Sequence, residues 1–577
     1  MVGKISGNPN ERSFQIPFVM GVTGHRDLCP NDIPHLEDRV RTVLEDFRTR
    51  LPSTPLLLLS ALAGGADQVV ASVALQCGVE LVAVLPMPKH VYRSTVDAEA
   101  QSVFDELLSK ASLVIDLPLN DLNVEQLNES EETRARAYDS LGRFLGAHCQ
   151  ALIALWDGLP SEKAGGTARV IQYMLEGPSP TDSDDGPQAG IVYHIRTPRT
   201  SNPAPRGEPF QLSVLTSLDG AQDENIKDFR SLAQQLEAFN REVMKVDLAA
   251  SPTCGSLVPD SASGSLSSFE KRAAHIYFAA DQLSLDFNNW TRLVLMVLLA
   301  FAFTALAGFE IYAHVLSHKI ALWLVYPIAL LAAWLTYRVA RKHEIETKYF
   351  DYRALAEALR VQFFWSLAGI QEPVADHYLQ HHRTELDWIR YALRSISIYR
   401  NPADTQETEK VAKTELALKH WVEHQAHWYS GKSARQQGIL GRLDRLSRRS
   451  LFVVWLVSMI VPLSLLASWH VLAVWQELAS HETNHGLLLL LVPLPSLAIG
   501  LFRVWVEQSG YDVQARKYHH MAQIFRRAAA RVQGLLDQKK VEDARETLRR
   551  LGIEALEENG DWLLLHREHP LKVVGSA

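Results

Sequence analysis

The stretch FVMGVTGHR, Phe18–Arg26, decides the fold of the first half of the chain. It begins as a short apolar run and ends in the turn residues Gly24, His25 and Arg26. An amphipathic helix is predicted soon after, over His35–Arg50. Apolar runs of this kind are typical of strands that are buried on both faces of a parallel sheet. The stretch therefore predicts a β-strand, a turn and a helix in succession.

The same unit repeats along the first 200 residues. PLLLLSALAGGAD, Pro55–Asp67, predicts a second buried strand that enters a helix at Gln68–Cys77. A further long helix is predicted over Glu131–Cys149. The remaining predicted strands are ELVAVLP at 80–86, SLVIDLP at 112–118, ALIALWDG at 151–158, and Ile191–Ile195. Alternating strands and helices predict a Rossmann-like parallel α/β sheet that helices cover on both faces.

Three glycine turns follow predicted strands, at Gly24, at Gly64–Gly65 and at Gly165–Gly166. Parallel strands end on one edge of a sheet, and open α/β sheets bind ligands in a crevice at that edge. Helix N-termini present free N–H groups that bind phosphate. The three turns therefore predict one shared ligand crevice. The plain alternative is that these glycines only make tight turns.

Several side chains near these turns have two interpretations each. Arg26 and His25 add positive charge to a phosphate cradle that Gly21, Thr23 and Gly24 leave open. Asp67 either bonds a ribose hydroxyl or caps its own helix. The residues Trp156, Asp157 and Gly158 at the end of the fifth strand either hold a base or sugar of the ligand, or have no ligand role, with Trp156 only packing at the rim.

Four later segments are almost uncharged and long enough to cross a bilayer as helices. They are Arg292–Tyr312, Ile320–Tyr337, Leu451–Trp475 and Gly486–Trp505. Basic residues follow the second and fourth segments and precede the third, whereas the two hairpin loops carry a single lysine. By the positive-inside rule, both hairpin loops lie outside and both termini are cytoplasmic. The second half is thus predicted to be an all-α transmembrane domain with four spans, long cytoplasmic helices and a homo-oligomeric assembly.

Composition narrows the class of protein. The chain has 577 residues and a net charge of −8, which gives no overall attraction to nucleic acid. Its four cysteines form no Cys-x-x-Cys pair, which favours buried thiols in a reducing compartment over a disulfide or zinc framework. The polar N-terminus lacks the apolar segment of a cleaved signal peptide. The predicted organisation is a nucleotide-binding domain at 14–249, a flexible linker at 250–268, a first hairpin with its helix at 269–370, a helical segment at 371–440, a second hairpin with its helix at 441–557, and a tail at 558–577.

The ordered motifs GVTGHRDL, LSALAGGADQVVA, VAVLPMP, ARAYDSLGRFLGAHCQALIALWDG and AGGTARVI resemble the SLOG superfamily of Rossmann-like domains, which is related to the LOG and DprA groups. The resemblance covers roughly residues 14–200 and implies binding of a nucleotide or an NAD-derived signal of the ADP-ribose type. It places the pocket on Gly21, Thr23, Gly24, His25, Arg26, Gly64, Gly65, Asp67, Tyr138, Asp157, Gly165, Gly166 and Thr167.

The second half, with LDWIRYALR and KHWVEHQAHWY, resembles the SLATT group of transmembrane effectors that accompany SLOG sensors. This resemblance implies a bacterial inner-membrane effector that permeabilises the membrane in antiphage defence. The alternative is a membrane-anchored LOG-like enzyme that hydrolyses nucleotides. Ala168 and Arg169 stand where that group has a glutamate after its glycine turn, which counts against catalysis. A third possibility is a membrane scaffold with a vestigial pocket.

One short segment matches a metal-binding motif. His420, Glu423 and His424 match the H-x-x-E-H pattern of zinc proteases. No protease-like context surrounds them, so an exposed helix that packs through Trp421 and Trp428 is the preferred interpretation, with no metal expected.

Overall fold

The computed structural model describes residues 14–119, 124–161, 165–177, 190–203, 205, 207–217, 222–246, 257–317, 319–378, 386–400, 407–467, 490, 492–508 and 511–568. The chain divides into two compact units, and each is described by itself. The sheet unit comprises residues 1–281, 354–413 and 552–560. The helical unit comprises residues 282–353, 414–551 and 561–577.

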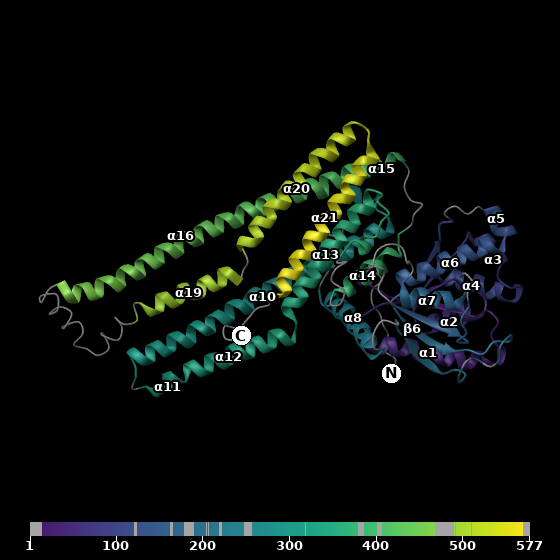
Figure 1. Ribbon diagram of the computed structural model, residues 1–577, viewed down its shortest axis with the longest axis horizontal. Helices are drawn as coiled ribbons and strands as arrows, with labels where there is room; N and C mark the ends of the chain where they lie inside the picture. Colours follow the sequence, from purple (N-terminus) through teal and green to yellow (C-terminus); the bar gives the residue numbers. More distant parts are fainter. Residues whose placement is uncertain are drawn as a thin grey trace. The chain divides into compact units, whose positions relative to one another are not determined.

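A seven-stranded sheet forms the centre of the sheet unit, in the order β4-β3-β2-β1-β5-β6-β7. Six strands are parallel, and β7 pairs antiparallel with β6 (Figure 1). The strands are β1 Phe18–Gly24, β2 Leu56–Ser60, β3 Glu80–Leu85, β4 Leu113–Asp116, β5 Ala151–Trp156, β6 Ile191–Arg196 and β7 Leu212–Leu215. The predicted parallel α/β sheet is confirmed, whereas the short β7 was not predicted from the sequence.

Burial explains why the central strands are so apolar. Every residue of β2 is buried, and β1 and β5 are buried except at their last residue. Helices separate the parallel strands along the chain, as a parallel sheet requires. They are α1 Ile33–Arg50, α2 Ala66–Gln76, α3 Lys89–Ser94, α4 Gln101–Lys110, α5 Val124–Glu129, α6 Glu131–His148 and α7 Thr167–Glu176.

Segments from far along the chain complete the sheet unit. Helix α8 (Gln222–Val243) contacts α14 (Asp387–Ser397), and the rings of Phe239 and Trp388 lie 6.0 Å apart. Gln150 donates a hydrogen bond to the Ser395 hydroxyl at 3.0 Å. Gly552 packs so closely on the buried Trp365 that a Cβ there would lie 2.2 Å from the indole nitrogen. The α/β core therefore includes residues that follow the first predicted hairpin.

The segment predicted as a linker is partly described. Residues 250–256 lie outside the described residues, whereas 257–268 contain the short helix α9 (Asp260–Ser263). Leu257, Val258 and Leu266 are buried. Apolar burial of this kind anchors residues 257–268 within the sheet unit.

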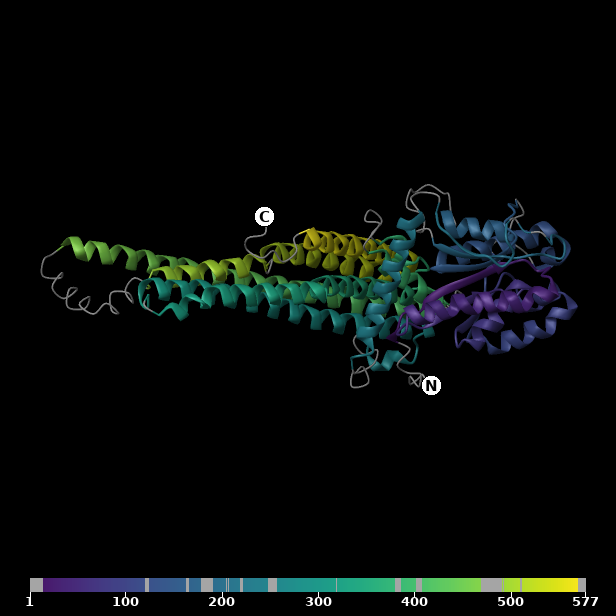
Figure 2. The same ribbon diagram turned by 90° about the horizontal axis from the view of Figure 1, so that it is seen from below.

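Long helices make up the helical unit (Figure 2). They are α10 Ser268–His314, α11 Ile320–Trp323, α12 Val325–Lys342, α13 Ile345–Leu367, α15 Glu407–Ala417, α16 His424–Ala467, α19 Pro493–Gln508, α20 Tyr511–Asp537 and α21 Val541–Glu568. The π-helical turn Leu418–Glu423 joins α15 to α16. Helices α10, α13, α15 and α21 have residues in both units.

Two stretches of the described chain are long and apolar enough to cross a membrane, Ser268–His314 and Ile320–Leu367. Only 11% and 6% of their most apolar windows are buried, which is unlike the mostly buried core helix of a soluble protein. They contain the first two expected spans. The expectation of four spans is not met among the described residues. Positions 468–475 of the third, and 486–489 and 491 of the fourth, lie outside those residues, which leaves a shorter apolar helix at Pro493–Val506.

Candidate functional site

The candidate site lies where the direction of strand order reverses. From β1 the chain builds β2, β3 and β4 on one side and then returns to β5 on the other. Neighbouring β1 and β5 are parallel, so Gly24–Arg26 and Trp156–Gly158 leave the sheet at the same edge. The backbone N–H of His25 donates to Leu155 O at 3.2 Å. In open α/β sheets, ligands bind at such a switch point, outside the carboxyl ends of the strands.

Close backbone packing explains two of the predicted glycines. Gly65 has φ +79°, and a Cβ there would lie 2.4 Å from Arg26 O and 2.6 Å from His25 O. A Cβ on Gly24 would lie 2.4 Å from the Ala66 Cβ. The N–H of Ala66 donates to His25 O at 3.0 Å. These contacts hold the N-terminus of α2 directly against the turn after β1.

The loop after β2 is held in an uncommon backbone conformation. Leu62 is buried and has φ +58°, which is strained for a branched side chain. Its N–H donates to Ser60 Oγ at 3.0 Å, and Gln68 Nε2 donates to Leu62 O at 3.3 Å. Asp67 accepts hydrogen bonds from the backbone of Ala61 and Ala63. The prediction that Asp67 caps its own helix is wrong, because the N-cap is Gly65 and has no side-chain cap, whereas Asp67 braces the preceding loop.

The electrostatics of Asp67 follow from its burial. Burial raises the pKa of Asp67 to about 7, against the opposing effects of its two backbone donors and Arg26. The pKa of the nearby Tyr92 is also raised, first by burial and then by the charge of Asp67. Among the described residues, the fully buried Tyr92 hydroxyl has no hydrogen-bond partner. The buried Asp67 and Tyr92 therefore lie beside the N-terminus of α2.

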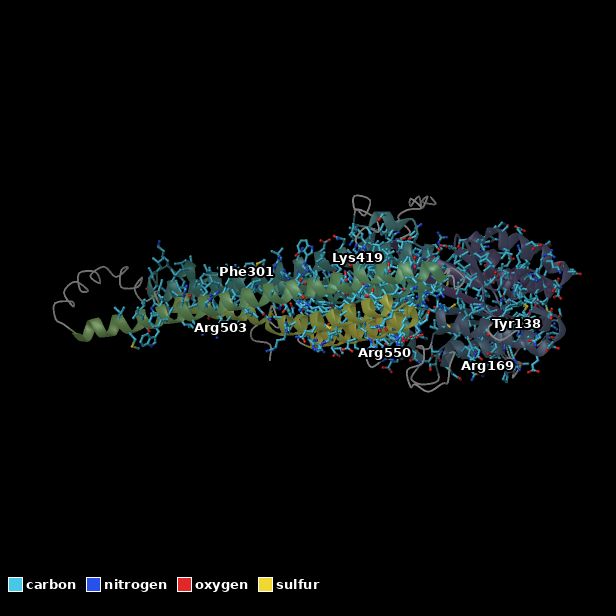
Figure 3. All side chains as sticks on the ribbon, turned by 90° about the horizontal axis from the view of Figure 1, so that it is seen from above. Tyr138, Arg169, Phe301, Lys419, Arg503 and Arg550 are labelled. Carbon is cyan, nitrogen blue, oxygen red and sulfur yellow. The ribbon has the colours of Figure 1, made fainter. Side chains whose placement is uncertain are left out.

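Arg26 reaches across the opening to α6. Its Nη2 donates to Tyr138 Oη at 3.2 Å, and its Nη1 donates to Thr95 O at 3.3 Å. The Thr95 and Tyr138 hydroxyls are 3.1 Å apart. Arg26 remains solvent-exposed, which leaves its guanidinium accessible to an anion. Figure 3 shows Tyr138 and Arg169, on α6 and α7, in the sheet unit.

The third glycine turn meets the same group of residues. Gly165 has φ +71°, and a Cβ there would lie 2.4 Å from the Tyr138 Cβ. Gly166 is the N-cap of α7 and Thr167 is its first residue. Neither α2 nor α7 has a side-chain cap at its N-terminus. Apart from the N–H groups of Ala66 and Arg169, which donate to His25 O and Gly166 O, their first-turn N–H groups are the kind of donor that binds a phosphate.

His25 and Asp157 form the floor between β1 and β5. The backbone N–H of Asp157 donates to His25 Nε2 at 3.2 Å, and that nitrogen is also 3.2 Å from Asp157 Oδ1. Burial and the charge of Arg199 lower the pKa of His25, despite the opposing effect of Asp157. The lowered pKa favours a neutral His25 ring at physiological pH, whose Nε2 lies between the N–H and the carboxylate of Asp157.

The carboxylate of Asp157 is held by several hydrogen bonds and is not free. It is 2% exposed and accepts hydrogen bonds from Arg199, Asn202 and the Leu159 N–H. Burial by itself raises the pKa of Asp157, but the hydrogen bonds that the carboxylate accepts and the neighbouring His25 have a larger effect, so the pKa is lowered. Arg199 also pairs with Asp27 at 2.9 Å. The carboxylate therefore stays ionised and holds the segment after β6 against the site.

Not every predicted residue lies at the carboxyl edge of the sheet. Gly21 lies in the middle of β1, where a Cβ would lie 2.7 Å from Cys149 Sγ, so this glycine serves packing. Thr23 is 8% exposed within the same strand. Gly64 is buried and has room for a Cβ, with its nearest contact at 3.5 Å. The other predicted residues lie at the carboxyl edge, around the turns described above.

Three residues of the site were not predicted from the sequence: Thr95, Arg199 and Asn202. Arg199 and Asn202 follow β6, whose carboxyl end joins the same edge, so the position of that strand was the available signal. Thr95 follows the short helix α3 and gave no such signal. At the zinc-like string, no group of three or more possible metal ligands occurs anywhere in the part of the chain that the structure describes. Trp421 is buried there and packs on Phe525 at 6.1 Å.

Comparison with known proteins assigns no family. No model of a known protein family matches the chain, and no curated protein matches it either.

Proposed function

We propose that this chain is a membrane-inserted sensor whose sheet unit binds a nucleotide or an NAD-derived ligand of the ADP-ribose type. Binding then changes membrane permeability through the helical unit, in antiphage defence of a bacterium. The observation that carries the proposal is the switch point between β1 and β5. The N-termini of α2 and α7, which have no side-chain cap, lie at the edge where these strands end, together with the exposed Arg26 and the His25 ring.

The arrangement suits a ligand that combines phosphate with polar hydroxyl groups. Helix N-termini and an arginine fork recognise phosphate oxygens. Tyr138 supplies an aromatic ring and a hydroxyl beside Arg26, whose Cζ lies 5.5 Å from the ring centroid. A net charge of −8 disfavours a nucleic acid as the partner, so a small anion is the better fit.

The membrane part of the proposal rests on α10 and on the stretch Ile320–Leu367. Large apolar side chains are exposed along both, including Leu293, Phe303, Ile328 and Trp334. A soluble protein rarely leaves such a surface bare, whereas a bilayer covers it. We propose four spans in the inner membrane, with both hairpin loops outside and both termini cytoplasmic, assembled as a homo-oligomer.

The chain itself links ligand and membrane in this proposal. Helices α10, α13 and α21 contribute residues to both units. A ligand shifts a conformational equilibrium only by its differential affinity for the two states. A ligand that draws the α2 and α7 N-termini together meets this requirement if the two states differ in that spacing.

A nucleotide-hydrolysing enzyme is the second candidate. Most carboxylates around the crevice are occupied: Asp67 by the loop, Asp157 by Arg199 and Asn202, and Asp27 by Arg199 and Ser201. Asp97 is exposed and lies beside Gly64, with its Oδ2 3.9 Å from the position of a Cβ there. Asp97 is therefore the general base to test.

The experiment is calorimetric titration of the full chain in detergent with AMP, ADP, ATP, NAD and ADP-ribose. The full chain is required because residues 354–413 belong to the sheet unit. Arg26→Ala removes a charge-assisted contact, and a loss of roughly 10- to 100-fold in affinity is expected. Arg50→Ala, an exposed arginine paired with Asp46, is the control and binds as the parent does.

Three outcomes separate the candidates. Saturable binding that depends on Arg26, without turnover, supports the sensor. Turnover that Asp97→Asn abolishes supports the enzyme. Absence of binding to every nucleotide refutes both and leaves the scaffold.

A further inference from the structure

The first turns of α10 contact the residues that follow α14 through two pairs of an arginine and an aromatic ring. The Cζ atom of Arg272, on α10, lies 4.2 Å from the centroid of the Tyr399 ring. In the opposite direction, the Cζ atom of Arg400 lies 5.1 Å from the centroid of the Phe269 ring. Both distances are within cation–π range. All four residues belong to the sheet unit, and their contact is called the arginine interface below.

Four buried polar atoms of the arginine interface have no hydrogen-bond partner among the residues that the structure describes. They are Arg272 Nε, Tyr399 Oη, Arg400 Nε and Arg400 Nη2. Each of these atoms can donate a hydrogen bond. Buried polar groups are nearly always paired in native proteins, so several unpaired donors at one contact indicate that an acceptor is missing there.

The free atoms of Arg400 form one edge of its guanidinium group. Its third nitrogen, Nη1, donates to the carbonyl oxygens of Gln371 at 2.5 Å and Glu372 at 3.5 Å. The Nε–Nη2 edge remains, and its two parallel N–H groups match a carboxylate or a phosphate bidentately. Burial lowers the pKa of Arg400 to about 10, against the opposing effect of Glu270, so the group is still a cation at neutral pH.

The acidic side chains near the interface do not satisfy these donors. Glu270 accepts hydrogen bonds from the Ser267 N–H at 2.8 Å and from Ser366 Oγ at 3.3 Å. Glu80, whose charge acts on Tyr399, accepts from Ser112 Oγ at 2.7 Å. The described chain therefore offers no acceptor to the Nε–Nη2 edge of Arg400.

We propose that the arginine interface is a second ligand site, which binds a small oxyanion, a carboxylate or a phosphate, on the Nε–Nη2 edge of Arg400. Arg272 Nε and Tyr399 Oη are further donors at the same contact. Arg272, Tyr399 and Arg400 are each only half-buried, so their closed-off atoms lie just below the surface. The anion therefore enters by a movement of these side chains and needs no unfolding of the sheet unit.

This site is separate from the nucleotide crevice. Arg272 Nη2 donates to Gln15 O at 3.3 Å, and Gln15 shortly precedes β1. The arginine interface thus lies near the amino end of β1, whereas the crevice lies at the carboxyl ends of β1 and β5. The inference goes beyond the proposed function and does not rest on it.

The test is the thermal midpoint of the sheet unit in the full chain in detergent, with sodium acetate or sodium phosphate compared against sodium chloride at equal ionic strength. Labelling of the buried thiols of Cys77 and Cys149 reports unfolding in a Cys29→Ser/Cys254→Ser background. Arg26→Ala is added to this background so that anions at the crevice do not contribute. An anion that binds only the folded state raises the midpoint, by roughly 3–4 °C at about 100 times its Kd for a unit of this size.

Two substitutions of Arg400 separate the fork from its charge. Arg400→Met removes both, and its midpoint should not respond to either oxyanion. Arg400→Lys keeps the charge but not the fork, and should need roughly tenfold more anion for the same rise. The matched control is Arg50→Met, at an exposed arginine that pairs with Asp46, and it should respond as the parent does.

Circular dichroism checks that each variant folds. If Arg400→Met does not fold, Tyr399→Phe gives a second series, because it keeps the ring and removes one donor. Its anion requirement should rise roughly 2- to 10-fold.

The two salts identify the ligand chemistry. A rise with acetate alone supports a carboxylate site, and a rise with phosphate alone supports a phosphate site. A midpoint that follows ionic strength only, or an anion response that Arg400→Met retains, overturns the proposal. Failure of the nucleotide titration leaves this measurement untouched, because its background already lacks Arg26.

Discussion

Gly65→Ala tests the packing that builds the candidate site. The substitution places a methyl group 2.4 Å from Arg26 O and 2.6 Å from His25 O, both rigid backbone atoms. It also forces alanine into φ +79°, ψ −120°. An unfavourable backbone conformation costs about 1–3 kcal/mol, and overpacking a filled site costs about 1–3 kcal/mol more. The expected destabilisation is therefore about 2–6 kcal/mol.

Two other glycines separate these contributions. Gly78 has φ +72° with nothing within 4 Å of a Cβ, so Gly78→Ala measures the backbone cost alone. Gly64 has no positive φ, and a Cβ there meets only ordinary contacts at 3.5 Å and beyond, so Gly64→Ala should be nearly neutral. The predicted order of stability is Gly64→Ala, then Gly78→Ala, then Gly65→Ala.

Thermal unfolding followed by thiol labelling is the assay. In a background of Cys29→Ser and Cys254→Ser, the remaining thiols are Cys77 and Cys149, and both are buried in the sheet unit. Their labelling therefore reports unfolding of that unit within the full chain. At an unfolding entropy of about 2.1 cal/mol/K per residue, a cost of about 4 kcal/mol lowers the midpoint of a unit of this size by roughly 5 °C. A Gly65→Ala midpoint equal to that of Gly64→Ala would refute the packing of the α2 N-terminus against His25 and Arg26.

Four further predictions follow from the contacts of the sheet unit and from the proposed topology. Asn240→Ala removes the buried partner of Ile16 N, Ile16 O and Thr54 Oγ1, and should lower stability by about 2–4 kcal/mol in the same thiol assay. A shift below about 1 kcal/mol contradicts the contact of α8 with the residues that precede β1 and β2. Tyr138→Phe keeps the ring but frees Arg26 Nη2, and calorimetry should show nucleotide affinity lowered roughly 2- to 10-fold, whereas unchanged affinity removes the hydroxyl from the site. Asp67 has a pKa of about 7 in the folded state, above the value of 3.8 in the unfolded state, so the folded state holds the Asp67 proton more tightly. The free energy of unfolding should therefore fall as the pH rises from about 4 to 7. Asp67→Asn should abolish this pH dependence in scanning fluorimetry, and a pH dependence that persists in the variant belongs to another group. Ser317→Cys, in the loop between α10 and α11 in a cysteine-free background, should react with an impermeant maleimide from outside intact cells, and labelling only after lysis reverses the proposed orientation.

Local patterns in the sequence were enough to predict the six parallel strands and most of the carboxyl-edge residues, but not β7. Buried parallel strands must be apolar throughout, and the chain must turn where they end. Consecutive residues therefore reveal β1, β2 and β5 and the turns that follow them. The long apolar segments of α10 and α12 were predictable for the same reason, since their apolar residues are consecutive in the sequence.

Contacts between distant residues were decided only by the tertiary structure. Arg199 and Thr95 join the site from elements that the sequence does not relate to β1, because a side chain's partner depends on strand order rather than on spacing. Gly21 and Gly24 look alike in the sequence, yet one fills a packing contact inside the strand and the other admits α2. The inclusion of residues 354–413 in the sheet unit was equally hidden, because an apolar pattern records that a face is buried but not which segment covers it.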